Sequence, residues 1–136
     1  MSFLKKFFSP CCPLAKYSDN DNKYINLFKE EVKNVPGKLD PSCMHNYYCE
    51  DLQVINNGEQ LDFKQFQELH EKAFVNLKSI TTKFDDIYAV GNRLSVRVTF
   101  TQHLGNGGAN DVHIAILAEY KNDKIHRMWQ TMYPLI

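Results

Sequence analysis

The chain has 136 residues, and its 16 basic side chains balance its 16 acidic ones, so the formal net charge at pH 7 is zero. A chain of this length forms one domain and buries a core without disulfides or a metal ion. The balanced charge excludes a protein that is drawn to nucleic acid or to acidic membranes by a global field. We therefore expect no nucleic-acid partner.

The four cysteines do not follow the spacing of a metal site. Cys11 and Cys12 are adjacent, whereas Cys43 and Cys49 lie six positions apart. Neither spacing is that of a zinc site, and no cluster of His, Asp or Glu has metal-ligand spacing. We predict no metal and no cofactor, and reduced thiols in a cytoplasmic protein.

An N-terminal arm over residues 1–20 is predicted to precede a folded domain over residues 21–136. The apolar stretch of the arm holds two lysines and is soon followed by proline, so it is too short for a signal-peptide core or a membrane-spanning helix. One hypothesis is a peripheral membrane anchor over residues 1–16, with Cys11 and Cys12 as acylation sites. The alternative is an arm that packs on the domain or frays.

Helical signals open the predicted domain. Potential N-cap residues from Ser18 onward, followed by apolar residues at helical spacing up to Val35, predict an amphipathic helix that Pro36-Gly37 ends. Asp40-Pro41 places an N-cap residue before a proline at the first helical position. We therefore predict a short helix that carries residues 43–48.

A short strand and a longer helix follow. Residues 52–56 are typical of a strand, and the Asn57-Gly58 turn ends it. Asp62 and Gln65 have the spacing of a capping box, and apolar residues then recur on one helix face up to Leu77. This is the clearest helix signal in the sequence.

The remainder of the chain predicts four antiparallel strands. The first of them ends at Val90, and the other three cover residues 93–103, 112–120 and 125–133. Two-residue turns are expected at Gly91-Asn92 and Asn122-Asp123. The Gly/Asn-rich segment 105–110 joins two strands rather than a strand and a helix, so we interpret it as a hairpin loop and not as a phosphate-binding loop. Asp85 and Asp86 are neighbours on a strand, so we expect them to point to opposite faces and to form no carboxylate pair.

The side-chain pattern of two of these strands bears on which sheet face is buried. Residues 112–120 are apolar on one face, and the outer face also holds Ala115 and Leu117. This pattern predicts a homodimer through the outer sheet face. The last strand divides into a set that contains Trp129 and a set that contains His126, Met128, Gln130 and Met132. Periodicity does not decide which set faces inward.

The order of these elements resembles that of the SnoaL-like, polyketide-cyclase-type members of the nuclear-transport-factor-2-like superfamily. The resemblance extends from Tyr24 to Tyr133 and includes the segment Val90-Gly-Asn-Arg-Leu-Ser-Val, the hairpin from Ile116 to Ile125 and the tryptophan at Trp129. It implies an α+β fold, a cone-shaped half-barrel in which a curved, mostly antiparallel sheet wraps around N-terminal helices. It further implies a mostly apolar pocket and a homodimer.

The same resemblance implies which residues would carry chemistry. In isomerase-like members, a carboxylate base, a tyrosine and a protonated aspartate act together, and the matching positions here are Asn56, Phe28 and Ile116. In the cyclases the last strand reads roughly His-Trp-Asp, and the matching residues are Met128, Trp129 and Gln130. None of these replacements exchanges a proton near neutral pH. Whether the chain is an enzyme stays open.

The inward set of the last strand determines the predicted pocket. If that set contains Gln130, then His126 also faces the ligand and is able to act as a base. The alternative is that His126 is a solvated residue at the end of the strand. The residues predicted to line the pocket are Phe28, Tyr47, Asn56, Ile116, His126, Met128 and Gln130.

The other four histidines are less suited to line the pocket. His45 lies beside the tyrosines of the short helix, either near the pocket mouth or in the core. His70 lies midway along the capped helix and is predicted to be on the surface. His103 and His113 fall on the outer sheet face, where they suit an interface better than catalysis.

Two functions from different classes are consistent with the sequence. The first is a pocket protein that binds a hydrophobic small molecule. The second is a noncatalytic dimeric module whose N-terminal arm contacts a membrane or a protein partner, which gives a peripheral-membrane location as the alternative to a cytoplasmic one.

Overall fold

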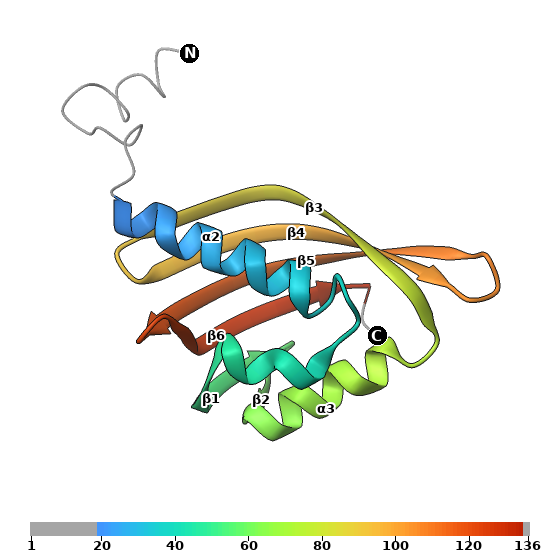
Figure 1. Ribbon diagram of the computed structural model, residues 1–136, viewed down its shortest axis with the longest axis horizontal. Coiled ribbons are helices and arrows are strands. Elements are labelled where there is room, and N and C mark those ends of the chain that lie inside the picture. Colours follow the sequence, from blue (N-terminus) through green and yellow to red (C-terminus); the bar gives the residue numbers. More distant parts are fainter. Residues whose placement is uncertain (1–18, 135–136) are drawn as a thin grey trace, which may run out of the picture.

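A computed structural model describes residues 19–134, which form a curved six-stranded sheet with helices on one side of it (Figure 1). The predicted N-terminal arm, with Cys11 and Cys12, lies outside the described residues. None of the helices within residues 19–134 is long and apolar enough to cross a membrane. The α+β half-barrel that the sequence predicted is confirmed.

Helix α2 (Asp19–Asn34) is the first predicted helix. Its Phe28, Val32 and the following Val35 are buried, as helical spacing requires. Beyond the helix, the Gly37 amide donates to the Val32 carbonyl over 2.9 Å. A Cβ atom at Gly37 would lie 2.4 Å from the Lys33 carbonyl oxygen, so only glycine fits this close turn.

The predicted short helix is a 3-10 helix, η1 (Pro41–Asn46), capped by Asp40, which accepts from the Ser42 amide over 3.0 Å. Strand β1 (Tyr48–Asn56) begins four residues earlier than the periodicity indicated. Its pairing with the last strand shifts register between Tyr48 and Gln53, so the first half of β1 lacks the alternation that would have revealed it.

Strand β2 (Glu59–Leu61) was not predicted. Asn57 and Gly58 have φ values of 49° and 85°, which makes them a two-residue hairpin turn that returns the chain against β1. The turn signal was present in the sequence, but a strand of three residues is too short to show a period of two.

Helix α3 (Phe63–Phe74) confirms the predicted capping box. The Gln65 amide donates to Asp62 Oδ1 over 2.8 Å, and the Asp62 amide donates to Gln65 Oε1 over 2.9 Å. The helix ends before Leu77 because that residue already pairs with Leu104 in the sheet.

The four long strands are β3 (Leu77–Val90), β4 (Arg93–Leu104), β5 (Ala109–Lys121) and β6 (Lys124–Tyr133). The order across the sheet is β2-β1-β6-β5-β4-β3, and all neighbours are antiparallel except β1 and β6. The core lies between the concave sheet face and the helices (Figure 1). Its largest fully buried side chains include Phe28, Phe66, Met44, Ile125 and Met128.

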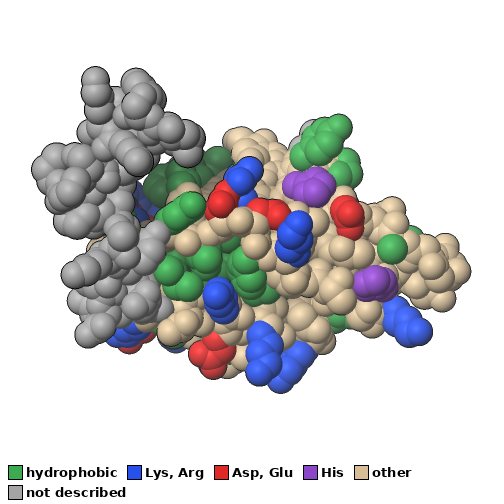
Figure 2. Space-filling view, turned by 90° about the horizontal axis from the view of Figure 1, so that it is seen from above, with side chains coloured by type: hydrophobic (Ala, Val, Ile, Leu, Met, Phe, Trp, Pro, Cys, Tyr) green, Lys and Arg blue, Asp and Glu red, His purple; other side chains and the backbone are tan. Residues whose placement is uncertain are grey.

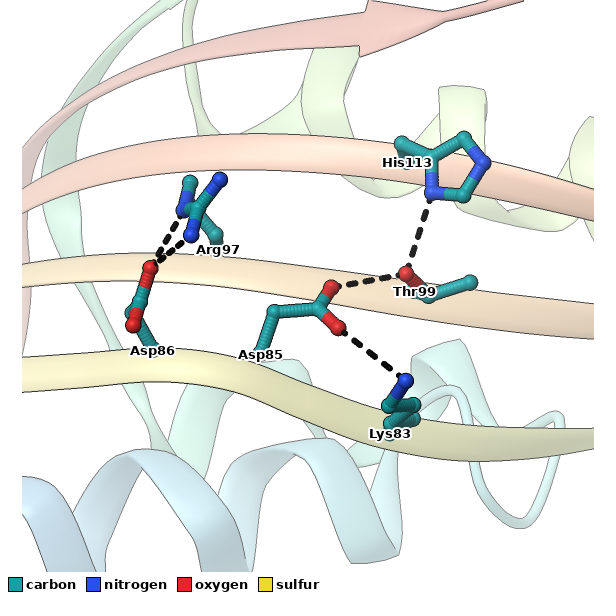
Figure 3. A network of polar contacts seen from close by, with 6 residues as sticks. All are labelled: Lys83, Asp85, Asp86, Arg97, Thr99 and His113. Carbon is teal, nitrogen blue, oxygen red and sulfur yellow. Dashed lines mark hydrogen bonds and ion pairs between the residues drawn. The ribbon is translucent and has the colours of Figure 1, made fainter.

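A bulge in β3 corrects the prediction that Asp85 and Asp86 point to opposite faces. The pairing of β3 with β4 shifts register between Phe84 and Asp86, so both carboxylates lie on the outer face (Figure 3). Asp86 contacts Arg97, and Asp85 accepts from the Thr99 hydroxyl over 2.8 Å. The two carboxylates form no pair because each has its own partner on β4.

The polar part of the outer face is mixed in charge. Lys83 Nζ lies 3.7 Å from Asp85 Oδ1, and His113 Nδ1 lies 3.0 Å from the Thr99 hydroxyl (Figure 3). His113 therefore lies on the outer face, as predicted. Figure 2 shows acidic, basic and histidine side chains close together on one face of the molecule. This arrangement agrees with the absence of a single-sign field in a chain of zero net charge.

Candidate functional site

A cavity of about 310 Å³ lies between α2, α3 and the concave face of the sheet. Its walls are mostly apolar and come from two helices and five strands that are far apart in the sequence. The main apolar side chains of the wall are Phe28, Phe66, Phe100, Ile116, Met128 and Met132. A concave apolar site with few polar groups is typical of small-molecule pockets.

Five of the residues predicted for the pocket border this cavity. The inward set of the last strand contains Met128 and Gln130, so Trp129 points outward and is 41% exposed. The five residues are Phe28, Asn56, Ile116, Met128 and Gln130.

Tyr47 and His126 do not border the cavity. The Tyr47 hydroxyl accepts from Asn34 Nδ2 over 2.6 Å, and His126 Nε2 lies 3.3 Å from Asp51 Oδ2. The pairing of β5 with β6 shifts register between Glu119, which pairs with Arg127, and Tyr120, which pairs with Ile125, so His126 lies at the irregularity. Ile125 is fully buried. Because of this irregularity, His126 does not share the cavity wall with the rest of its alternating set.

Asn56 and Gln130 form a buried amide pair at the cavity wall. They are register partners on the parallel strands β1 and β6, and Gln130 Nε2 donates to Asn56 Oδ1 over 2.8 Å. Both side chains are more than nine-tenths buried. Within the described part of the chain, Asn56 Nδ2 and Gln130 Oε1 have no hydrogen-bond partner. The pair therefore offers a ligand one donor group and one acceptor.

Glu31 is an acidic residue of the cavity that the sequence analysis missed. It is 4% exposed, and its Oε1 accepts from the Tyr48 hydroxyl over 2.8 Å. Burial raises the pKa of Glu31 to about 7, although the bond from Tyr48 opposes this shift. The signal was its position, three residues after Phe28 and one before Val32, on the buried face of α2.

His70 is the histidine that borders the cavity, although the sequence predicted a surface residue. Its Nδ1 lies 2.8 Å from the Phe66 carbonyl oxygen. A carbonyl only accepts, so Nδ1 carries the proton and Nε2 keeps its lone pair. The rings of Phe66 and Phe74 pack edge-on against the imidazole. Burial lowers the pKa of His70, so the ring is neutral near pH 7.

Metal chemistry finds no support among residues 19–134. Their His, Cys, Asp and Glu side chains form no group of three that is able to hold a metal ion. Cys43 and Cys49 are free thiols, and burial raises the pKa of both. A raised pKa lowers the thiolate fraction and hence the reactivity of these cysteines.

The polar groups of the cavity are suited to bind a polar atom and to exchange protons. They comprise a carboxyl group that titrates near neutrality, a neutral imidazole and an amide pair, and the walls around them are apolar. Opposite pKa shifts of an acid and a base in one cavity are a feature of acid–base sites.

No family model and no curated protein matches the sequence. Solved structures do match the fold. A SnoaL-like polyketide cyclase from Agrobacterium tumefaciens has a TM-score of 0.67 at 13% identity, over 82% of this chain and 91% of that one. TsrD from Streptomyces laurentii has a TM-score of 0.69 at 11% identity, over 87% and 92%. The chain thus has the SnoaL-like, nuclear-transport-factor-2-like fold.

A designed protein with a curved β-sheet matches equally well. Its TM-score is 0.65 at 17% identity, over 87% of this chain and 89% of the designed chain. Natural and de novo designed chains therefore share this backbone arrangement. The function of the present chain must be argued from its own cavity residues.

Proposed function

We propose that the chain binds a small, largely apolar molecule in the cavity and recognises one carbonyl or hydroxyl group of it through Asn56 and Gln130. The observation that carries this proposal is the buried amide pair, which keeps an unpartnered donor and an unpartnered acceptor among the described residues. The cavity volume of about 310 Å³ suits a ligand of one or two fused rings.

The proposal follows from the hydrogen-bonding capacity of the amide pair. Neither free atom of the pair is among the fully buried, unpartnered side-chain atoms of the described residues, so both are accessible from the cavity. A ligand hydroxyl would bind both atoms, because it donates to Gln130 Oε1 and accepts from Asn56 Nδ2. Apolar walls around these two atoms favour a ligand that is apolar elsewhere.

A matched pair of probes tests this recognition. We expect naphthol to bind at least tenfold more tightly than naphthalene, because the two hydrogen bonds of its hydroxyl group together contribute about 1–3 kcal/mol. Gln130→Leu should remove this preference, whereas Thr131→Leu, on the exposed neighbouring residue, should keep it. Calorimetric or fluorescence titration measures both affinities. Equal binding of the two probes to the parent protein would contradict the assignment.

We further propose that two copies associate through the outer sheet face. Register partners place one row of side chains across five strands: Ile55, Trp129, Leu117, Ser95 and Tyr88. The four large members of the row are 37–55% exposed. An exposed row on a sheet in which four of five side chains are large and mostly apolar suits a self-complementary interface between two copies.

Charge placed in this row tests the self-association. We expect the parent protein to sediment as a dimer and the double variant Leu117→Lys, Trp129→Lys to sediment as a monomer, because two buried lysines would face their symmetry mates. Glu68→Lys, on the exposed side of α3, is the control and should leave the dimer intact. A parent protein that is monomeric at micromolar concentration would refute the proposal.

A further inference from the structure

We propose that Glu31 and His70 form a proton-transfer pair, and that the chain catalyses a reaction in which a carbon atom of the bound molecule loses a proton and an oxygen atom gains one. This inference rests on the proposed binding function and extends it from binding to catalysis. His70 is assigned as the base, and Glu31 is assigned as the acid.

The geometry supplies both groups to one cavity. Glu31 comes from α2 and His70 from α3, the two helices that flank the space, and both border the same cavity as the amide pair. Each keeps one atom without a partner among the described residues, namely Glu31 Oε2 and His70 Nε2. Their other polar atoms are fixed by Tyr48 and by the Phe66 carbonyl, so the free atoms are held in position.

The surroundings set the protonation states that the two roles require. Burial keeps a substantial fraction of Glu31 protonated near pH 7, and burial keeps His70 neutral. The titratable groups that act electrostatically with Glu31 are Tyr48 on β1, Tyr120 on β5 and Cys43 on η1, and none of them is a cation. The only other charged residue in the described cavity lining is Lys72, which is exposed.

Neither member of this pair stands at a position where the resemblance places catalytic groups. The acid–base positions of the isomerase-like members hold Phe28, Asn56 and Ile116, and those of the cyclases hold Met128 and Gln130; none of these side chains exchanges a proton near neutral pH. The amide pair complements the reaction, because it offers a hydrogen-bond donor and an acceptor to a ligand oxygen in the same cavity. The chain thus carries a different set of groups for acid–base chemistry in the same kind of cavity.

Benzisoxazole and its nitro derivative are suitable probes, because each contains a C–H bond that a base can ionise. His70 Nε2 removes the carbon-bound proton, the released electron pair forms the nitrile, and the N–O bond breaks to give a phenolate. Glu31 protonates this phenolate oxygen, and solvent restores both side chains. The nitro group makes the phenolate a good leaving group, so only the plain probe needs the acid.

We expect the full-length protein to accelerate ring opening of both probes over buffer. His70→Gln should slow both reactions about 100-fold. Glu31→Gln should slow the plain probe far more than the nitro probe. His126→Ala removes a histidine outside the cavity and should leave both rates unchanged. Circular dichroism and unfolding curves of each variant show whether it is folded under the assay conditions.

The pH profile separates a catalytic from a structural role. For the plain probe, the rate should rise as His70 loses its proton and fall as Glu31 ionises near pH 7, which gives a bell shape. In Glu31→Gln the falling limb should disappear. A structural role would change the rate at every pH without removing one limb.

Each outcome decides between the two proposals. If the probes bind in the cavity by titration but no acceleration occurs, or if His70→Gln turns over as fast as the parent, the proton-transfer inference is wrong and the binding function survives. If the probes and naphthol all fail to bind, the binding function fails, and the catalytic inference fails with it. Turnover that requires His70 and shows the Glu31-dependent limb supports both.

Discussion

The Glu31→Gln variant should lose a pH dependence of stability that the parent protein shows. Between the ordinary glutamate pKa of 4.5 and the folded-state value of about 7, folded Glu31 binds a proton that the unfolded chain has released. The stabilisation that results from this bound proton is therefore complete below pH 4.5 and is lost as the pH rises through 7. We expect the free energy of unfolding to fall by about 3 kcal/mol over this range relative to Glu31→Gln.

Urea unfolding at a series of pH values measures this difference. His70 acts in the opposite direction, because its lowered pKa destabilises the folded state as the pH falls through the ordinary histidine range. Subtracting the Glu31→Gln profile from that of the parent removes the common contribution of His70. Glu30→Gln, on the exposed neighbour of Glu31, should behave as the parent. Parallel profiles for parent and Glu31→Gln would show that Glu31 is not buried as described.

Filling the cavity should abolish ligand binding. Ile116 is register partner to Gln130, so Ile116→Trp places an indole directly beside the amide pair and in the space that the ligand would occupy. We expect naphthol affinity to fall about 100-fold, which corresponds to about 3 kcal/mol of binding free energy. Titration of naphthol against the purified variant measures the effect.

The next residue supplies a matched control for this experiment. Leu117 lies on the outer face of the same strand and is 55% exposed, so Leu117→Trp adds the same ring outside the cavity. Its affinity for naphthol should equal that of the parent. An equal loss of naphthol affinity in both variants would indicate a general effect on the sheet. Unchanged naphthol affinity in both variants would show that the ligand binds outside this cavity.

Local signals in the sequence predicted most of the fold. The capping box of Asp62 and Gln65 and the turn at Asn122 and Asp123 depend on neighbouring residues, and the structure contains both. Features that depend on partner strands were harder to predict. The bulge that brings Asp85 and Asp86 to one face arises from pairing with β4, which alternation along β3 does not reveal.

The candidate site was predicted in part. The sheet residues Asn56 and Gln130 were found because their positions follow from the resemblance and from strand alternation. The helix residues Glu31 and His70 were missed because polar residues within a helix are usually solvated. Each occupies the apolar stripe of its helix, and His70 lies four residues from both Phe66 and Phe74. A polar residue within such a stripe was the available signal.

Methionine-methyl NMR of the parent protein during a naphthol titration tests the central claim most directly. Met128 and Met132 border the cavity, whereas Met44 is fully buried in the core and does not border it. The ring current of a bound naphthol should shift the methyl signals of Met128 and Met132 with one common binding curve and leave that of Met44 in place. If neither cavity methyl shifts while naphthol binds, or if naphthol does not bind at all, the cavity is not a ligand site.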